Sequence, residues 1–279
     1  MILPTFIGIG PGRTGTSMIY EAFLAHPQIC MARNTKETNY FNREYARGPE
    51  WYTAFFSDCT GAGATGEISN TYIYDPLVPA RIAADLPQVK LFTILRNPFA
   101  RLQSAFRYRQ RSGELPPRLT LEEAIEQHPD LLAQNAYGDQ LARFLAVIPR
   151  EQLLILFYDD LVADPAGFMA RLFAYLQVDD RIQPAVIFRR VNPEVEARSP
   201  LAARLTRLAA DTLRRWQLHG LLDRAKRSTA VRRLLFKESN PGVDQPDHRL
   251  NARLQTCFEP QIKQVETLTG RDLQHWYQP

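Results

Sequence analysis

The sequence has few cysteines and no long hydrophobic run. Its 279 residues include only Cys30, Cys59 and Cys257, which are odd in number and far apart in the chain. These three fit neither a disulfide framework nor a zinc site, so we expect them to be buried or incidental and the compartment to be a reducing cytoplasm. A membrane-spanning helix needs about 18 consecutive apolar residues. No stretch of the sequence reaches this length, so no membrane span is expected.

A basic leader is also missing at the N-terminus. The first apolar residues run directly into a glycine-rich loop, which indicates a core strand and not a signal peptide. The composition, 45% hydrophobic and 23% charged, suits one globular domain that can bury a sizeable core. We expect this domain to cover 1–279, with an α/β nucleotide-binding core over 1–183 and a mostly helical portion over 184–279.

Positive charge is concentrated in one region. The formal net charge is +4, but 198–237 holds eleven Lys and Arg residues against two Asp residues. Such a surplus fits an acidic partner, and it equally fits the solvated face of one or two helices. No nucleic-acid motif and no aromatic-interleaved basic stretch accompanies it, so nucleic acid is not expected as a partner.

The most informative stretch is 6–17, where an apolar run meets a glycine-rich turn. Thr14, Thr16 and Ser17 then open a predicted helix. Glycines let the backbone approach a ligand closely, and the start of a helix offers unpaired N–H groups and a positive dipole end. These properties predict a cradle for a phosphate-like anion.

This loop differs from the loop that binds nucleoside triphosphates. The pattern G-x-x-x-x-G-K-[S/T] can be laid on 10–17, but Thr16 stands where the lysine is required. The cation of the loop, Arg13, comes three residues earlier. The sequence therefore predicts a protein that holds a nucleotide without handling a γ-phosphate in the usual way.

Strand and helix signals alternate along the first part of the chain. Strands are expected over 5–9, 64–69, 89–95 and 153–157, and helices over 16–25, from Asn97-Pro98 onward, over 137–147 and over 165–176. Strands separated by helices predict an α/β fold with a P-loop-like central parallel sheet flanked by helices. Beyond Pro184 the strand signals fade, and 201–235 and 253–268 are expected to be helical.

Three features that are distant in the sequence should converge at the carboxyl ends of the strands, where such sheets bind ligands. They are the loop 12–17, the group Arg96, Arg101 and Ser104, and the pair Lys36 and Glu37. Arg101 and Ser104 are three residues apart on a predicted helix, so a guanidinium and a hydroxyl can meet one anion. Two anion sites on one nucleotide are therefore predicted.

These stretches also occur in the order found in one enzyme family. The chain resembles sulfotransferases that use 3′-phosphoadenosine 5′-phosphosulfate (PAPS), especially the heparan-sulfate-type enzymes and their soluble bacterial relatives. The matching stretches are 10–17, 36–41, 66–72, 95–104, 153–161 and 268–273, followed by Trp276. Each motif alone has low specificity, whereas the ordered set is specific and runs over most of the chain.

The resemblance implies a role for individual residues. The 5′-phosphosulfate would be held by Gly12, Arg13, Thr14, Gly15, Thr16 and Ser17, and the 3′-phosphate by Arg96 and Ser104. Glu37 matches the general base proposed for the family, which takes the proton of the acceptor. Lys36 and Arg13 would stabilise developing negative charge, so no metal is expected to be required.

Two positions depart from the family pattern. Arg13 stands where the loop often carries lysine. An arginine stabilises charge but stays protonated, so Arg13 cannot donate a proton to the leaving phosphate. Ile68 stands where heparan-type enzymes often have lysine, so the acceptor contact expected from that lysine is absent.

The expected reaction moves a sulfuryl group from PAPS to a hydroxyl or amine, leaving adenosine 3′,5′-bisphosphate (PAP). The acceptor would be a carbohydrate or a small natural product, free or carrier-bound. Two alternatives stay open. The strand 153–157 followed by Asp159 mimics the strand and aspartate that anchor magnesium in P-loop kinases and NTPases. A non-catalytic glycan- or carrier-binding module with the same nucleotide fold is the other alternative.

Overall fold

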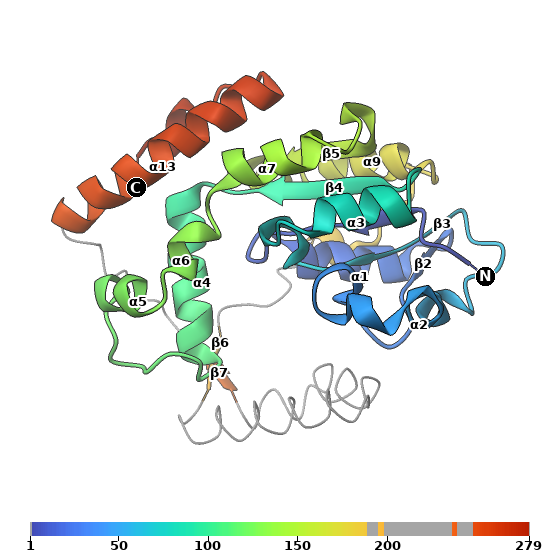
Figure 1. Ribbon diagram of the computed structural model, residues 1–279, viewed down its shortest axis with the longest axis horizontal. Coiled ribbons are helices and arrows are strands. Elements are labelled where there is room, and N and C mark those ends of the chain that lie inside the picture. The colour runs from blue at the N-terminus through green and yellow to red at the C-terminus, as the bar shows by residue number, and fades with distance from the viewer. Residues whose placement is uncertain (1, 189–194, 198–235, 239–247, 279) are drawn as a thin grey trace.

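A five-stranded parallel sheet forms the centre of the protein (Figure 1). The computed structural model describes residues 2–188, 195–197, 236–238 and 248–278. The strands are β1 (Phe6–Gly8), β2 (Ile29–Met31), β3 (Ala64–Ile68), β4 (Lys90–Leu95) and β5 (Leu153–Phe157). Their order across the sheet is β2-β3-β1-β4-β5, and all neighbouring pairs run parallel. The predicted central parallel sheet of an α/β fold is therefore confirmed.

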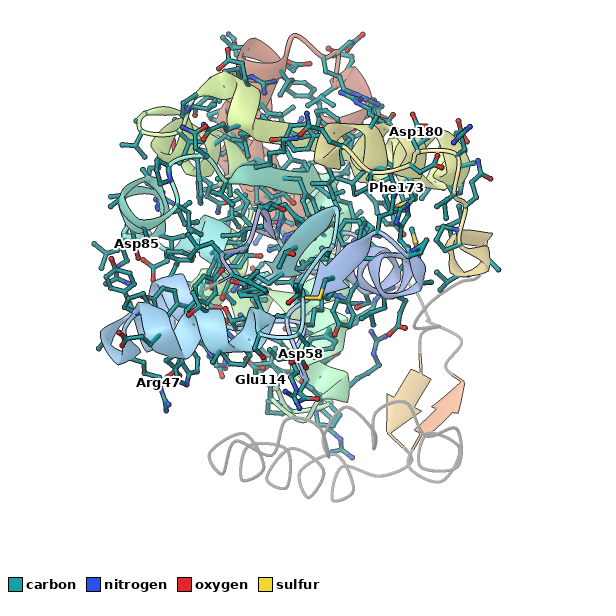
Figure 2. All side chains as sticks on the ribbon, turned by 90° about the vertical axis from the view of Figure 1, so that its right-hand side faces the viewer. Arg47, Asp58, Asp85, Glu114, Phe173 and Asp180 are labelled. Carbon is teal, nitrogen blue, oxygen red and sulfur yellow. A yellow bond between two sulfur atoms is a disulfide. The ribbon has the colours of Figure 1, made fainter. Side chains whose placement is uncertain are left out.

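Helices cover both faces of this sheet. The longer ones are α1 (Thr16–Ala25), α3 (Val78–Asp85), α4 (Pro98–Arg111), α7 (Tyr137–Leu145), α9 (Pro165–Leu176) and α13 (His248–Thr269), and the shorter ones are α2 (Pro49–Thr53), α5 (Leu121–Gln127), α6 (Asp130–Ala133) and α8 (Tyr158–Ala163). On one face, α1 and α9 pack together with Phe6, and the ring of Phe23 lies 6.1 Å from that of Phe173. Figure 2 shows Phe173 on α9. On the other face, α3, α4, α7 and α13 pack together with Ile7. Burial on both faces explains why the strands can be predicted from continuous apolar runs.

The start of α4 follows the sequence prediction. The side chain of Asn97 accepts hydrogen bonds from the backbone N–H groups of Phe99 and Ala100, and Pro98 occupies the first helical position. Asparagine at the cap and proline at the first position favour a helix start. This start places Arg96 directly between β4 and α4, at the end of the sheet where ligands bind.

Two strand regions differ from the sequence prediction. β2 has three residues, too few to show an apolar run of its own. Beyond Pro184, where no strand was expected, β6 (Val195–Ala197) pairs antiparallel with β7 (Phe236–Glu238). A strand of three residues is too short to show a periodic pattern in the sequence. It is held in place by its pairing with a strand from another part of the chain.

The described residues of the C-terminal portion are mostly helical, apart from β6 and β7, and α13 contains the predicted helix 253–268. The other predicted helix, 201–235, lies outside the described residues, and the division of the domain after residue 183 stays a prediction. A Cβ on Gly138 of α7 would lie 2.4 Å from the Gln264 side chain, so glycine permits the close packing of α13 on α7. No helix among the described residues combines the length and the apolar character needed to cross a bilayer.

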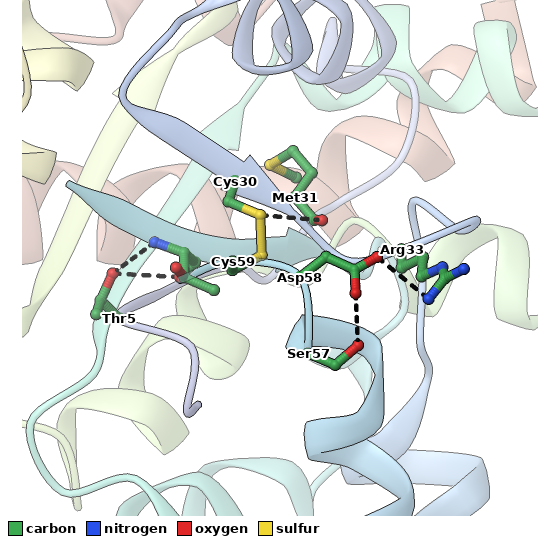
Figure 3. Close-up of a disulfide and its surroundings, with 8 residues drawn as sticks. Thr5, Cys30, Met31, Arg33, Ser57, Asp58 and Cys59 are labelled. Atoms are coloured by element: carbon green, nitrogen blue, oxygen red, sulfur yellow. Dashed lines mark hydrogen bonds and ion pairs between the residues drawn. A yellow bond between two sulfur atoms is a disulfide. The ribbon is translucent and has the colours of Figure 1, made fainter. Parts of the chain in front are cut away.

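The expectation that no disulfide forms is wrong. Cys30 in β2 and Cys59, shortly after the turn Ala54–Phe56, are joined by a disulfide with their Cα atoms 5.5 Å apart (Figure 3). The segment between β2 and β3 must return along the edge strand before it enters β3, and this return brings the two cysteines together. Cys257 is free and exposed. The cytoplasmic location stays a prediction, without the support that unpaired cysteines lent to it.

Loss of this disulfide is expected to lower the free energy of unfolding by about 2–4 kcal/mol, because a closed loop restricts the unfolded chain. Urea unfolding of Cys30→Ser, compared with the wild type, measures the change. Wild type in a reductant should unfold like this variant, and Cys257→Ser should behave like the untreated wild type. An unfolding midpoint of the wild type that ignores the reductant would contradict the disulfide.

Candidate functional site

The carboxyl ends of the central strands bring the predicted features together. The loop 10–17 follows β1, Asn70 comes shortly after β3, and Arg96 follows β4. Because β1 lies between β3 and β4 in a parallel sheet, these segments leave the sheet side by side. The segment with Lys36 joins the same edge, since the backbone N–H of Ile68 donates to the Lys36 carbonyl at 3.2 Å. This edge of the sheet is the candidate site.

Two glycines let the first loop pack closely against its surroundings. Gly10 has a φ of 100°, and a Cβ there would lie 2.3 Å from the carbonyl oxygen of Asn70. Gly15 has a φ of 87°, and a Cβ there would lie 2.6 Å from the Leu161 side chain. Both positions therefore require glycine. The loop leads into α1, whose first turn receives no side-chain cap from the described residues. Uncapped N–H groups at a helix start suit an anion.

The hydroxyl groups of the loop have different partners. Thr14 is fully buried, and its hydroxyl donates to the Pro11 carbonyl at 2.8 Å. This donation stabilises the loop, and the contact of the Thr14 hydroxyl with the ligand stays a prediction. The hydroxyl of Thr16 accepts a hydrogen bond from Lys36 Nζ at 2.9 Å. Ser17 is half-buried in the first turn of α1.

The second predicted anion site lies directly against the first loop. The Arg13 Nε donates to the Ser104 hydroxyl at 3.1 Å, and its guanidinium lies 4.8 Å from the centre of the Tyr108 ring. Arg96 Nη1 donates to the Arg13 carbonyl at 3.1 Å, and its guanidinium lies 4.7 Å from the centre of the Tyr158 ring. The structure therefore brings Arg96 and Ser104 within contact of the loop. Their roles in binding stay predictions.

A cavity of about 380 Å³ lies beside Arg96, between the start of α4 and α8. Its lining residues are Arg96, Asn97, Ala100, Tyr158, Asp159, Val162 and Ala163. Arg96 has no carboxylate partner among the residues that the structure describes. An arginine without such a partner in the lining of a cavity attracts negatively charged ligands.

Arg101 does not share an anion with Ser104, contrary to the sequence prediction. Its side chain is 1% exposed, and Nε donates to Asn135 Oδ1 at 2.7 Å. Nη1 donates to the Gly12 carbonyl at 3.3 Å and to the Tyr74 hydroxyl at 3.2 Å. Burial raises the pKa of Tyr74, so its hydroxyl stays neutral and can accept. Long side chains on a helix lean toward its N-terminus, so the Arg101 side chain extends toward Gly12 in the first loop. The Ser104 hydroxyl then contacts Arg13 and not Arg101.

Glu37 is half-buried, and its carboxylate accepts a hydrogen bond from Asn70 Nδ2 at 2.6 Å. Asn70 packs against both Gly10 and Gly12, so it connects the carboxylate to the first loop. Its Oδ1 is buried and accepts no hydrogen bond from the described residues. Asn70 lies in the stretch 66–72 that matches the family, where its residue type alone predicts no role. Its position just after β3, at the ligand-binding end of the sheet, is the signal that could have identified it.

Asp159, the candidate magnesium anchor of the kinase alternative, is engaged by the C-terminal segment. Its Oδ2 accepts from the Trp276 indole N–H at 2.7 Å and lies 2.9 Å from His275 Nε2. The neighbouring Asp160 forms a two-pronged ion pair with Arg271, with both N···O distances 2.6 Å. These carboxylates hold the chain end against α8, which gives the aspartate after β5 a structural role.

Two further predictions concern parts of the chain that bear less on this site. The arginine-rich region 198–237 lies almost entirely outside the described residues.

Within the described ranges, no group of three His, Cys, Asp or Glu side chains is placed to share a metal ion. Independence from metals stays a prediction.

The chain matches known proteins over most of its length. A family model described as "Sulfotransferase domain" matches residues 4–190. The chain is 33% identical over 198 residues to the bifunctional heparan sulfate N-deacetylase/N-sulfotransferase 4 of Mus musculus, covering 63% of this chain and 22% of that protein. It is 33% identical over 197 residues to the corresponding enzyme 3 of Homo sapiens, with the same shares. The chain thus matches only 22% of the length of these curated relatives.

One solved structure aligns over nearly the whole chain. The crystal structure of a sulfotransferase from Alicyclobacillus acidocaldarius superimposes with a TM-score of 0.71 over 99% of each chain. The sequence identity is 20%, so this match shows a shared fold.

Proposed function

Because the chain belongs to the sulfotransferase family, we propose that it transfers a sulfuryl group from PAPS to a hydroxyl or amine of a carbohydrate or small natural product. The names of the two mammalian relatives refer to heparan sulfate, which supports a carbohydrate acceptor. The acceptor is free or carrier-bound.

The observation that carries this proposal is the contact of two cationic groups with one loop. Lys36 reaches the loop at Thr16, and Arg96 reaches it at the Arg13 carbonyl, close to Ser104. PAPS has an anionic group on each side of its ribose, so its binding site needs two cationic groups a short distance apart. The donor set of the site fits this requirement: cations, hydroxyls and helix N–H groups bind sulfate and phosphate oxygens.

Each part of the site then has a task in binding. The start of α1 and Lys36 hold the 5′-phosphosulfate, and Arg96 with Ser104 holds the 3′-phosphate. Arg101 donates a hydrogen bond to the Gly12 carbonyl, which keeps the loop in its binding conformation. PAPS supplies the activated sulfuryl group, and the protein supplies orientation and charge.

Glu37 takes the proton of the acceptor as the acceptor oxygen or nitrogen forms its bond to sulfur. The bond from sulfur to the bridging oxygen breaks, and PAP leaves with the electron pair of that bond. Lys36 and the helix N–H groups stabilise the negative charge that develops on the sulfuryl and phosphate oxygens. Arg13 contributes charge alone, because a guanidinium does not release its proton.

Purified protein, PAPS and a panel of sugar and phenol acceptors test the proposal by measuring PAP release and sulfated product. We expect PAP to bind and to inhibit transfer, with the same rate in magnesium and in EDTA. Failure of PAP to bind or inhibit would overturn the proposal. Magnesium-dependent ATP binding would instead support the kinase alternative, for which the structure offers no free aspartate at position 159.

A further inference from the structure

Glu67 is a buried carboxylate next to the site whose function the reaction does not explain. It lies in β3 and is 0% exposed. Its Oε2 accepts from the Thr38 backbone N–H at 2.9 Å, the Thr38 hydroxyl at 2.7 Å and the Ser69 hydroxyl at 2.6 Å. Its Oε1 accepts from the hydroxyls of Tyr52 at 2.9 Å and Tyr72 at 3.0 Å. A buried charge is costly unless it is fully hydrogen-bonded, so this set of donors is specific to a carboxylate.

Three of these hydroxyls also accept hydrogen bonds from the backbone. Asn39 N–H donates to the Ser69 hydroxyl at 3.3 Å. Tyr40 N–H donates to the Thr38 hydroxyl, and Phe41 N–H to the Tyr72 hydroxyl, each at 3.2 Å. A hydroxyl has one proton, and here that proton is directed to the carboxylate. The backbone N–H groups of residues 38–41 are therefore linked to the Glu67 carboxylate by hydrogen bonds. Thr38 N–H donates to it directly, and the other three donate to a hydroxyl that in turn donates to it.

These N–H groups belong to the start of the π-helical turn Tyr40–Glu44, where the backbone has no helical partners. Glu67 thus caps this turn from within the sheet, as a side chain caps an ordinary helix. Burial raises the pKa of Glu67, and the hydrogen bonds from Ser69, Thr38 and Tyr52, which act in the opposite direction, limit this rise.

The segment fixed by Glu67 carries the residues that act on the sulfuryl group. At one end, the Lys36 carbonyl is bound by the backbone N–H of Ile68, the residue after Glu67. At the other end, residues 38–41 are bound through the carboxylate. Glu37 lies between these two attachments, and the Ser69 N–H donates to the Gly8 carbonyl of β1, next to the first loop.

We propose that Glu67 is a positioning residue for sulfuryl transfer, which holds residues 38–41 so that Glu37 stays in place beside Asn70 and the first loop. This inference rests on the proposed function. Misplacement of a reacting group by about 1 Å costs on the order of 100-fold in rate. The cost of disturbing Glu67 should therefore appear in turnover and leave nucleotide binding intact.

The first test is Glu67→Gln, which keeps the shape of the side chain and removes its charge. We expect kcat to fall about 100-fold, with the Kd for PAP unchanged. Tyr52→Phe is the matched control, because it removes one hydrogen bond from the same carboxylate and none from residues 38–41. It should keep turnover close to that of the wild type, since the stacking of Tyr52 on Tyr40, 4.4 Å between ring centres, needs no hydroxyl.

A double variant separates positioning from general stability. If Glu67 acts through Glu37, Glu67→Gln should cost little further turnover in a Glu37→Gln background. Losses that multiply would overturn the inference. If Glu67→Gln does not fold, Ser69→Ala, which removes the link to Asn39, takes its place with the same expectation. Wild type without any transfer would refute the proposed function, whereas an active wild type with an equally active Glu67→Gln would refute only the role of Glu67.

Discussion

Glu37→Gln is expected to reduce kcat by a factor of about 10²–10⁴ and to leave the Kd for PAP unchanged. Glutamine has the shape of glutamate, and its Oε1 can still accept the hydrogen bond from Asn70 Nδ2. It cannot take a proton from the acceptor, so the loss appears in the chemical step. Sulfate transfer at saturating PAPS and isothermal titration with PAP measure the two quantities.

Glu44→Gln is the matched control, because Glu44 ends the nearby turn Tyr40–Glu44 and pairs with Arg47 at the surface. It should retain the turnover of the wild type. Unchanged turnover of Glu37→Gln would show that another group is the base. PAP binding without transfer in the wild type, over the full acceptor panel, would favour the non-catalytic module.

The second large effect is expected in nucleotide recognition. Wild type should bind PAP more tightly than adenosine 5′-phosphate, because Arg96 and Ser104 hold the 3′-phosphate. A hydrogen bond to a charged group contributes about 1.5–3 kcal/mol. Arg96→Met should therefore reduce this preference about 10- to 100-fold, and Ser104→Ala should reduce it in the same direction. Titration of each variant with both nucleotides measures the preference.

The pattern over two ligands distinguishes recognition from damage to the loop. Arg96 also donates to the Arg13 carbonyl, so its loss could disturb the loop and weaken both nucleotides equally. An equal loss for both would contradict the assignment of the 3′-phosphate to Arg96. Arg171→Met removes the same charge from an exposed position on α9 and should leave both affinities unchanged.

Local patterns in the sequence predicted the main elements of the fold and the first loop. β5 and α1 have the predicted bounds, and α4 begins at the predicted Asn97-Pro98 start. The reason is that apolar runs, helix caps and glycine turns depend on φ and ψ preferences and on neighbours a few residues away. The order of the motifs likewise identified the family before any contact was known.

Contacts between distant segments were beyond the reach of the same patterns. The disulfide joins cysteines 29 residues apart, and Asp160 pairs with Arg271, which is 111 residues further along the chain. Glu67 in β3 caps the turn Tyr40–Glu44, which lies between β2 and β3. The direction of Arg101 toward Gly12, away from Ser104, belongs to the same class. The disulfide, the cap by Glu67 and the direction of Arg101 depend on the strand order β2-β3-β1-β4-β5, which sets the segments that leave the sheet as neighbours. The ion pair of Asp160 and Arg271 depends on the packing of the segment after α13. Residue types and spacing thus determined which chemistry this chain can perform. The packing of the sheet decided which side chains position the reacting groups. The reason is that burial and hydrogen bonding act through space and not along the chain.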